Sequence, residues 1–270
     1  EGTLTLTAEA ADIDASSATL TAKDEVKLTA KQSITAADAN VTSDSLAMTA
    51  DTGSVKASGF MSTVVDQALV EAGGSVTLDN AELTTGVLTA TANSGDLSLK
   101  SAELDISGAA KLTAQDSITA TDANVTSASL AMTTETGSVE ASGFKATVAD
   151  QASVEAGDTV VLDNAELTAG ALTATAKTGD LSVRNAEINA TKDGITLTAE
   201  VADIDASSAT LMAEDEVKLA AQNSITATDA SVTSDSLTMT AETGKLDGSR
   251  LTATVADQAS VVAGDTVVLD

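Results

Sequence analysis

Several residue types are missing from this chain. Its 270 residues include no Cys, Pro, His, Trp or Tyr and only two Phe. Without Cys there are no disulfides and no thiolate metal sites, and without His neither a Ser-His-Asp nor a Cys-His arrangement can form. A chain without Pro keeps every backbone N–H available as a donor, which suits strands that are paired on both sides.

Positive charge is also scarce. Thirteen Lys and Arg stand against 41 Asp and Glu, for a net charge of -28. Nucleic-acid binding needs basic residues that displace counterions, so we expect no nucleic-acid partner. An acidic surface repels anionic membranes and keeps a β protein soluble. We find no apolar run of 18 residues and no basic and apolar signal segment, so we expect no membrane insertion of this segment.

What the chain does contain is repetition at two scales. Residues 33–99 reappear as residues 117–183, an offset of 84, and the stretch that begins at Ser224 lies 107 positions after Ser117. Beneath these super-repeats a large aliphatic residue recurs about every seventh position, so that 84 is twelve such units and 107 is fifteen slightly longer ones. Three units per coil give coils of about 21 residues, and the difference of 23 between the offsets is one whole coil.

Stacking these coils predicts three inward ladders of aliphatic side chains. The first contains Leu6, Leu28, Met48, Val70, Leu88, Leu112, Met132, Val154, Leu172, Leu197, Leu219, Met239 and Val261. The second contains Ile13, Ile34, Val55, Leu78, Leu97, Ile118, Val139, Leu162, Leu181, Ile204, Ile225, Leu246 and Leu269. The third contains Leu20, Val41, Val64, Leu83, Leu104, Val125, Val148, Leu167, Ile188, Leu211, Val232 and Val255.

The local pattern favours strand over helix. Apolar and polar residues alternate with a period of two, as in residues 3–7 and 25–29. Pairs such as Thr52-Gly53, Asp79-Asn80 and Asp163-Asn164 fall between the strands, where Gly tolerates positive φ and Asn or Asp bonds its own backbone. We therefore predict an all-β parallel β-helix of three strands per coil and about 13 coils, roughly 60 Å long at ~4.8 Å per coil.

The sequence predicts one continuous solenoid over residues 1–270. It starts at Glu1 and stops at Asp270, the counterpart of Asp79 and Asp163, both in mid-repeat and without a recognisable polar cap. Solenoids normally need caps. We therefore expect a segment of a longer chain, or a subunit whose ends are covered head-to-tail by further copies.

Four short segments carry a family resemblance. They are GDLSL at 95–99, GDLSV at 179–183, GITLTAE at 194–200 and EVKLTAK at 25–31. They resemble the repeats of filamentous haemagglutinin-type adhesins and other very large bacterial surface proteins. The resemblance implies a right-handed parallel β-helix, a cell-surface or extracellular location and a structural role as a rod, stalk or filament segment. A cell-surface receptor stays open as a partner, and the sequence does not identify one.

Two binding alternatives stay open. Asp12 with Asp14, or Asp203 with Asp205, point out from one strand and are candidates for weakly bound divalent cations such as Ca²⁺. Acid alternates with Lys or Gln in other columns, as in Glu9, Lys31 and Asp51 and in Glu200, Gln222 and Glu242, which argues against an ordered cation column. Thr at alternate positions of residues 3–7, 88–92 and 172–176 is compatible with an ice-binding array, although Thr is also a favoured outward strand residue.

We predict that the chain is not an enzyme. Paired carboxylates support glycoside cleavage on some β-helices. Such sites usually need long loops and aromatic platforms, whereas these corners are short and aromatic residues are almost absent. The sequence therefore predicts no catalytic and no cofactor-binding residues.

Overall fold

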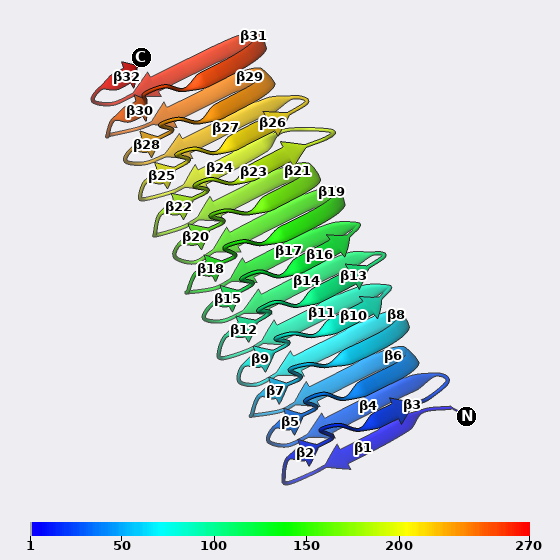
Figure 1. The fold of residues 1–270 in the computed structure, drawn as a ribbon. Coiled ribbons are helices and arrows are strands. Elements are labelled where there is room, and N and C mark those ends of the chain that lie inside the picture. The colour runs from blue at the N-terminus through cyan, green and yellow to red at the C-terminus, as the bar shows by residue number, and fades with distance from the viewer. Residues whose placement is uncertain (1) are drawn as a thin grey trace. The chain divides into compact units, whose positions relative to one another are not determined.

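The fold is an all-β parallel solenoid. The computed structural model describes residues 2–270, which contain strands, turns and bends and no helix. The chain divides into two compact units, one up to Glu135 and one from Thr136 to Asp270, and each is a stack of coils (Figure 1). Because no helix occurs between residues 2 and 270, none of that range is a candidate membrane-spanning helix.

Each unit has a row of short strands and a broader sheet. In unit 1 the short strands are β2 (Ile13–Asp14), β5 (Ile34–Thr35), β7 (Val55–Lys56), β9 (Val76–Thr77), β12 (Leu97–Ser98) and β15 (Ile118–Thr119). The broader sheet of unit 1 has β1 (Leu4–Ala8), β3 (Thr19–Thr21), β4 (Glu25–Ala30), β6 (Asn40–Ala50), β8 (Met61–Ala72), β10 (Glu82–Thr85), β11 (Val87–Ala92), β13 (Glu103–Ile106), β14 (Ala109–Ala114), β16 (Asn124–Ser127) and β17 (Ser129–Thr134).

Unit 2 repeats this division. Its short strands are β18 (Val139–Glu140), β20 (Val160–Val161), β22 (Leu181–Ser182), β25 (Ile204–Asp205), β28 (Ile225–Thr226), β30 (Leu246–Gly248) and β32 (Val267–Leu269). Its broader sheet has β19 (Lys145–Ala156), β21 (Glu166–Ala176), β23 (Glu187–Ala190), β24 (Ile195–Ala199), β26 (Thr210–Ala213), β27 (Glu216–Ala221), β29 (Ser231–Ala241) and β31 (Thr252–Ala263).

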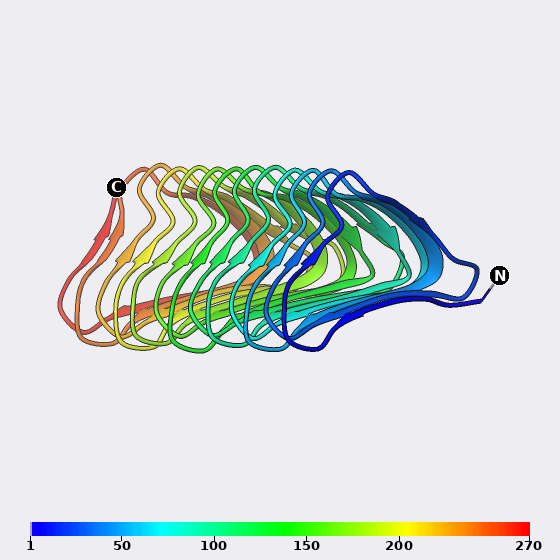
Figure 2. The same cartoon turned by 90° about the horizontal axis from the view of Figure 1, so that it is seen from below.

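One coil consists of a short strand followed by two segments of the broader sheet. The two segments are separate strands in some coils, as in β3 and β4, and merge into one bent strand in others, such as β6 and β8. The register shifts at the bend, between Ser43 and Ser45, where the Ser43 hydroxyl donates a hydrogen bond to the Ser45 carbonyl at 2.8 Å. Figure 2 shows the short strands of each unit in a row of their own, apart from the broader sheet. The predicted coil of about 21 residues is confirmed, since Ile13 pairs with Ile34 and Ile34 with Val55.

The predicted ladders are correct in most coils and wrong by two residues in some. Val55 pairs with Val76 instead of Leu78, Val70 with Ala90 instead of Leu88, and Val41 with Ser62 instead of Val64. The misplaced ladder members are Val64, Leu78, Leu88, Val148, Leu162, Leu172, Val255 and Leu269. Because the side-chain period of a strand is two, an error of two keeps a residue on the inner face, and all of these are buried except Val255 and Leu269 in the last coil.

One corner of each coil is set by a residue with positive φ. These residues are Ser17, Asp38, Gly59, Asn80, Ser101 and Asp122 in unit 1 and Gly143, Asn164, Asn185, Ser208, Asp229 and Arg250 in unit 2, with φ between 53° and 65°. The predicted corners at Asp79-Asn80 and Asp163-Asn164 are therefore confirmed. Gly53 does not have a positive φ, so the prediction that Gly is needed there to tolerate positive φ was wrong. A Cβ there would lie 2.6 Å from the Gln32 carbonyl oxygen, so Gly53 is needed for close approach between coils.

In several coils a large and a small buried side chain lie on opposite sides of this left-handed corner. Ala57 precedes Phe60 and Ala141 precedes Phe144, whereas Leu78 precedes Ala81, and all six are fully buried. In the last such corner Gly248 precedes Leu251, and a Cβ added to Gly248 would lie 3.3 Å from Leu251 Cδ2. In these corners a large residue on one side accompanies a small one on the other, which keeps the narrow core densely packed. Other corners have a buried Ala on both sides, such as Ala36 with Ala39 and Ala120 with Ala123.

Candidate functional surfaces

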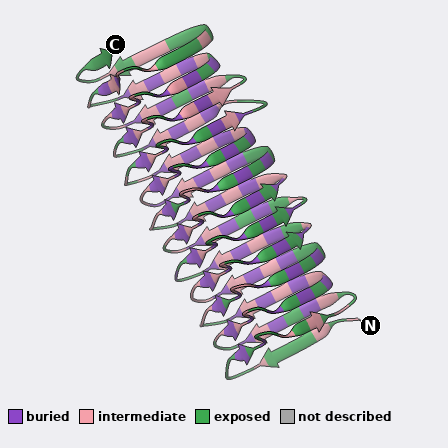
Figure 3. Cartoon of the chain, in the orientation of Figure 1, coloured by how far each residue is buried: buried purple, intermediate pink, exposed green. Residues whose placement is uncertain are grey.

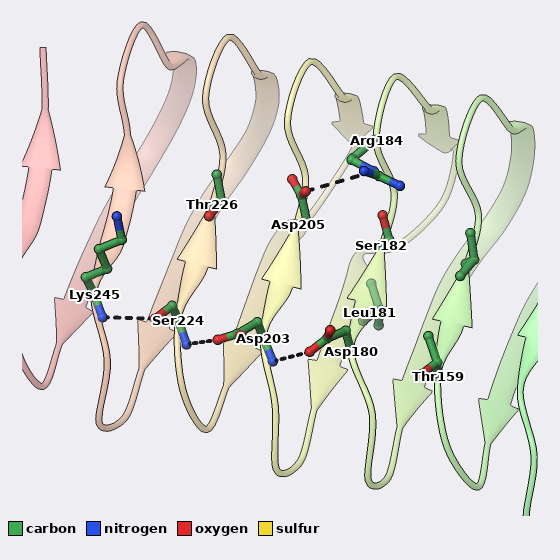
Figure 4. Close-up of a pocket in the computed structure, with 11 residues that line it drawn as sticks. Thr159, Asp180, Leu181, Ser182, Arg184, Asp203, Asp205, Ser224, Thr226 and Lys245 are labelled. Atoms are coloured by element: carbon green, nitrogen blue, oxygen red, sulfur yellow. Dashed lines mark hydrogen bonds and ion pairs between the residues drawn. The ribbon is translucent and has the colours of Figure 1, made fainter.

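A polar column runs along the corner that leads into the short strands. In unit 2 the Asp203 amide donates to Asp180 Oδ1 at 3.1 Å, the Ser224 amide to Asp203 Oδ1 at 2.7 Å, and the Lys245 amide to Ser224 Oγ at 3.3 Å (Figure 4). Unit 1 has the same column in Asp12, Ser33, Ser54, Ser75, Asp96 and Ser117. Each side chain accepts the backbone N–H of the next coil, so we call this the corner ladder.

The corner ladder of unit 2 borders an open hollow of about 540 Å³. Asp180, Asp203, Asp205, Arg184 and Lys245 supply its charged groups. Figure 4 shows Arg184 and Asp205 at the ends of the short strands, with the corner ladder where these strands begin. The hollow carries both signs of charge, and its carboxylates already accept hydrogen bonds from the protein.

Arg184 links two adjacent coils of unit 2 through the carboxylate of Asp163. Its Nε and Nη2 donate to Asp163 Oδ2 at 3.0 and 2.6 Å, while the Ser182 hydroxyl donates to Asp163 Oδ1 at 2.6 Å. Burial raises the pKa of the Asp163 carboxyl, but the hydrogen bonds from Arg184 and Ser182 outweigh it and hold the pKa below its usual value. This arrangement was not predicted. The available signal was the spacing of 21 residues between an Asp and an Arg, which places them in adjacent coils.

The predicted cation pairs serve the backbone instead of facing each other as a ligand set. Asp12 and Asp203 belong to the corner ladder, where each accepts a backbone amide at 2.7 Å. Asp14 and Asp205 each accept the hydroxyl of the Ser two residues later at 2.6 Å. This Ser16 hydroxyl, together with the Ser16 amide, lowers the pKa of Asp14. Among residues 2–270 no three acidic side chains converge in a way that would hold a metal ion. Calcium binding stays a prediction.

Charge alternation between coils is partly confirmed. Lys31 forms an ion pair with Asp51 in the next coil, as the Glu9, Lys31 and Asp51 column predicts. Elsewhere like charges are directly opposed, since Glu82 pairs in register with Glu103. The alternation is therefore a local feature of some columns.

Threonines form a longer column than the sequence indicated. On the outer face of unit 1, Thr7 pairs with Thr29 and Thr29 with Thr49, and after Glu71 the column continues through Thr91, Thr113 and Thr133. The neighbouring column breaks the array, because Thr5 is followed by Lys27, Ala47 and Leu69. A lattice-matching surface needs both columns, so the geometry gives ice binding no added support.

Aliphatic side chains are exposed on the first coil of unit 1 and the last coil of unit 2. Leu6 of β1 is 36% exposed, and Val262, Val267 and Leu269 of β31 and β32 are 53%, 43% and 55% exposed. Figure 3 shows these strands as largely exposed, in contrast to the buried bands of the coils between them within each unit. The edge strands of these two coils have one side without a strand partner among residues 2–270.

No protein family, curated protein or solved structure matches this chain. The surfaces therefore have to be judged from their own chemistry. The corner ladder, the ion pairs and the ladders of aliphatic residues all connect one coil to the next.

Proposed function

We propose that this chain is a structural segment of an extracellular rod, stalk or filament. The observation that supports it is that polar and apolar groups alike connect successive coils. The corner ladder caps backbone amides, the Asp163 to Arg184 pair links two coils, and aliphatic residues fill most inward positions of each unit. Such a stack resists deformation along its axis, and its length is set by the number of coils.

The setting on a bacterial surface follows from the resemblance to haemagglutinin-type repeats. In such an appendage the acidic side faces repel lateral partners at low salt, so that neighbouring stalks stay apart. The partners of this segment are then further coils of the same kind, and a receptor is bound elsewhere in the assembly. The chain carries out no catalysis in this role.

Electron microscopy of the producing cells tests the location. Antibodies raised against the folded chain and detected with gold particles should label filaments outside the cell envelope. Antibodies preabsorbed with the purified chain serve as the control. Specific label that is confined to the cytosol would reject the proposal.

Single-molecule stretching tests the mechanical role. A chain held at its two termini should lengthen in steps of about one coil, roughly 21 residues, because each coil is held mainly by its neighbours. The same measurement on Ile118→Asp should show weakening that starts near that coil. Continuous lengthening at low force, without steps, would contradict a load-bearing stack.

A further inference from the structure

The two exposed end coils are copies of internal coils whose neighbours are present in the structure. Leu4 of the first coil lies 191 positions before Ile195, and residues 4–21 repeat residues 195–212 with few changes. Thr252 lies 107 positions after Lys145 and 191 after Met61, so the last coil repeats residues 145–163 and 61–79. The coil that follows residues 61–79 therefore shows which residues can pair with the last coil.

Internal registers define how a first coil sits on a last coil. Ala68 pairs with Leu88 and Val70 with Ala90. By the same register, Leu4 of one molecule pairs with Ala259 of another, and Leu6 pairs with Val261. Val76 pairs with Leu97, which places Ile13 on Val267.

Side-chain size agrees with this register where β1 and β2 meet the last coil. The inward pairs are Ala259 with Leu4, Val261 with Leu6, Ala263 with Ala8, Val267 with Ile13 and Leu269 with Ala15. Ala259 with Leu4 repeats the internal pair Ala68 with Leu88, and Val261 with Leu6 joins two large aliphatic residues as Met48 with Val70 does.

Charge agrees as well. In this register the outward pairs are Ser260 with Thr5, Val262 with Thr7, Gly264 with Glu9, Thr266 with Asp12, Val268 with Asp14 and Asp270 with Ser16. No carboxylate faces another carboxylate, although the chain carries 41 acidic residues. In addition, Thr266 would continue the corner ladder, because Ser75 in the equivalent position accepts the Asp96 amide.

We infer that the last coil of one molecule binds the first coil of a second molecule, with Leu4 on Ala259, Leu6 on Val261 and Ile13 on Val267. The contact adds parallel β pairing to the burial of exposed aliphatics. This inference rests on the proposed structural role and specifies how segments join. Because the net charge of -28 opposes association, the binding between molecules becomes tighter as the salt concentration rises.

A mixing experiment tests the head-to-tail polarity. Leu6→Arg blocks the first coil and Val261→Arg blocks the last. In sedimentation velocity at 0.5 M salt, the wild-type chain should form dimers and longer species, and each variant alone should associate at least tenfold more weakly. An equimolar mixture of the two variants should form dimers that grow no further, because each dimer retains one intact contact and two blocked faces.

Matched controls separate burial from charge. Thr5→Arg and Ser260→Arg add the same charge one position away, on the outer face, and should each retain most of the association. Circular dichroism should show wild-type melting for all four variants, since the altered side chains lie in exposed end coils.

Cysteine pairs test the register in a chain that has no Cys of its own. Parallel neighbours lie about 4.8 Å apart, within the span of a disulfide. A mixture of Thr5→Cys and Ser260→Cys chains should form a disulfide-linked dimer at least tenfold faster than a mixture of Thr7→Cys and Ser260→Cys chains. The double variant Thr89→Cys/Lys111→Cys, whose positions are internal partners, is the positive control.

The outcomes separate this inference from the proposed function. A wild-type chain that stays monomeric up to millimolar concentration in 0.5 M salt overturns the inference. So does equal cross-linking of the two mixtures or equal loss of association in Thr5→Arg and Leu6→Arg. A monomer that still unfolds in coil-sized steps is consistent with the structural role. Antibody label confined to the cytosol would reject that role, whether the chain is a monomer or an oligomer.

Discussion

Residues 61–100 in unit 1 and residues 145–184 in unit 2 are two versions of the same stretch of solenoid, 84 positions apart. Both contain a left-handed Asn at the corner, Asn80 or Asn164, with φ of 55° or 57°. In both, an Asp accepts a hydrogen bond from a Ser hydroxyl at 2.6 Å, Ser98 to Asp79 and Ser182 to Asp163. The backbone arrangement is therefore common to the two copies.

The side chains around that arrangement differ in ways that leave the fold unchanged. Lys100 in unit 1 is replaced by Arg184 in unit 2, and only the Arg adds a two-pronged contact to the Asp carboxylate. Ser62 is buried without a hydrogen-bond partner, whereas Ala146 holds that position in unit 2. The comparison indicates that the two copies share the backbone conformation of the corner. The side chains that differ between them should affect stability and leave the fold unchanged.

The largest effect should come from a charge in the second aliphatic ladder, at two equivalent positions of unit 1 that lie 84 residues apart. Ile34→Asp and Ile118→Asp each place a carboxylate at a fully buried position, so each should lower the free energy of unfolding by more than about 4 kcal/mol. Thr35→Asp and Thr119→Asp, at the next and outward position, should cost less than about 1 kcal/mol. Urea denaturation followed by circular dichroism measures all four. Equal losses at inward and outward positions would invalidate the assigned faces.

The next effect concerns the alternation of volume around the left-handed corner. Phe144→Ala should cost about 3–4 kcal/mol because it leaves a cavity, and Ala141→Leu about 1–3 kcal/mol because it overfills the core. The double variant reproduces the Leu and Ala order of Leu78 and Ala81, and should lie within about 1 kcal/mol of the wild type. Thermal and urea denaturation of the three variants gives the coupling. Simple additivity of the two costs would show that these side chains pack independently.

Removal of the Asp carboxylate that precedes the left-handed Asn should have an intermediate effect. Asp163→Asn removes an acceptor of charge-assisted hydrogen bonds and should cost about 2 kcal/mol, more than Asp79→Asn in unit 1. Because the pKa of folded Asp163 lies below its usual 3.8, the stabilisation is present above about pH 4 and is lost as pH falls through the lowered pKa.

Exchange of the basic residue tests the cause of the lowered pKa. Arg184→Lys should return the Asp163 pKa toward 3.8, because it removes the hydrogen bonds from the guanidinium. NMR titration of the Asp163 carboxyl group measures the change. An Asp163 pKa that is unchanged in Arg184→Lys would assign the shift to Ser182 and the backbone amide instead.

A smaller effect is expected where a hydroxyl replaces a methyl in the core. Ser62 lies between Val41 and Leu83, and its Oγ has no partner. Ser62→Ala should therefore stabilise unit 1 by up to about 1 kcal/mol, and the reverse change Ala146→Ser should destabilise unit 2 by a similar amount. Melting temperatures give both signs. A loss of stability in Ser62→Ala would reveal a hydrogen bond that this hydroxyl makes in solution.

The smallest effect is electrostatic. Lys145 pairs with Glu166 at 2.9 Å in unit 2, whereas Met61 occupies that position beside Glu82 in unit 1. Met61→Lys should stabilise unit 1 by about 0.5 kcal/mol at low salt, since these groups are exposed. Urea midpoints at 20 mM and 1 M salt measure it. A gain that persists at 1 M salt would point to packing of the Lys stem rather than to the ion pair.

The fold was predictable from the sequence because coil length is a global property. Offsets of 84 and 107 admit whole coils of about 21 residues, and a large aliphatic every seventh position supplies the three segments. The register within a coil was less predictable. Leu78 and Val76 are both large, apolar and inward, so size alone did not show that Val76 pairs with Val55. The left-handed residue would have decided it, since Asp38, Gly59 and Asn80 follow one another at intervals of 21.

The surfaces were less predictable than the core. The sequence singled out Asp12, Asp14, Asp203 and Asp205 as outward acids, which is how the structure places them, but it did not show that backbone amides and Ser hydroxyls would occupy them. Such hydrogen bonds depend on which residues meet between coils, and that requires the exact register. The right-handed sense of the coil and the cell-surface setting still rest on the resemblance.

The left-handed corner has a consequence for how such a gene changes. Ser, Asp, Gly, Asn and Arg all occupy this position, and the backbone adopts the same φ with each of them. Each coil therefore contains the residue that forms its own corner, and many residue types can fill that position. Unequal crossing-over within the repeated gene would insert or delete whole coils, as the 23-residue difference between the two offsets illustrates, and each product would still fold. Length is thus a trait that selection can adjust in a single genetic step.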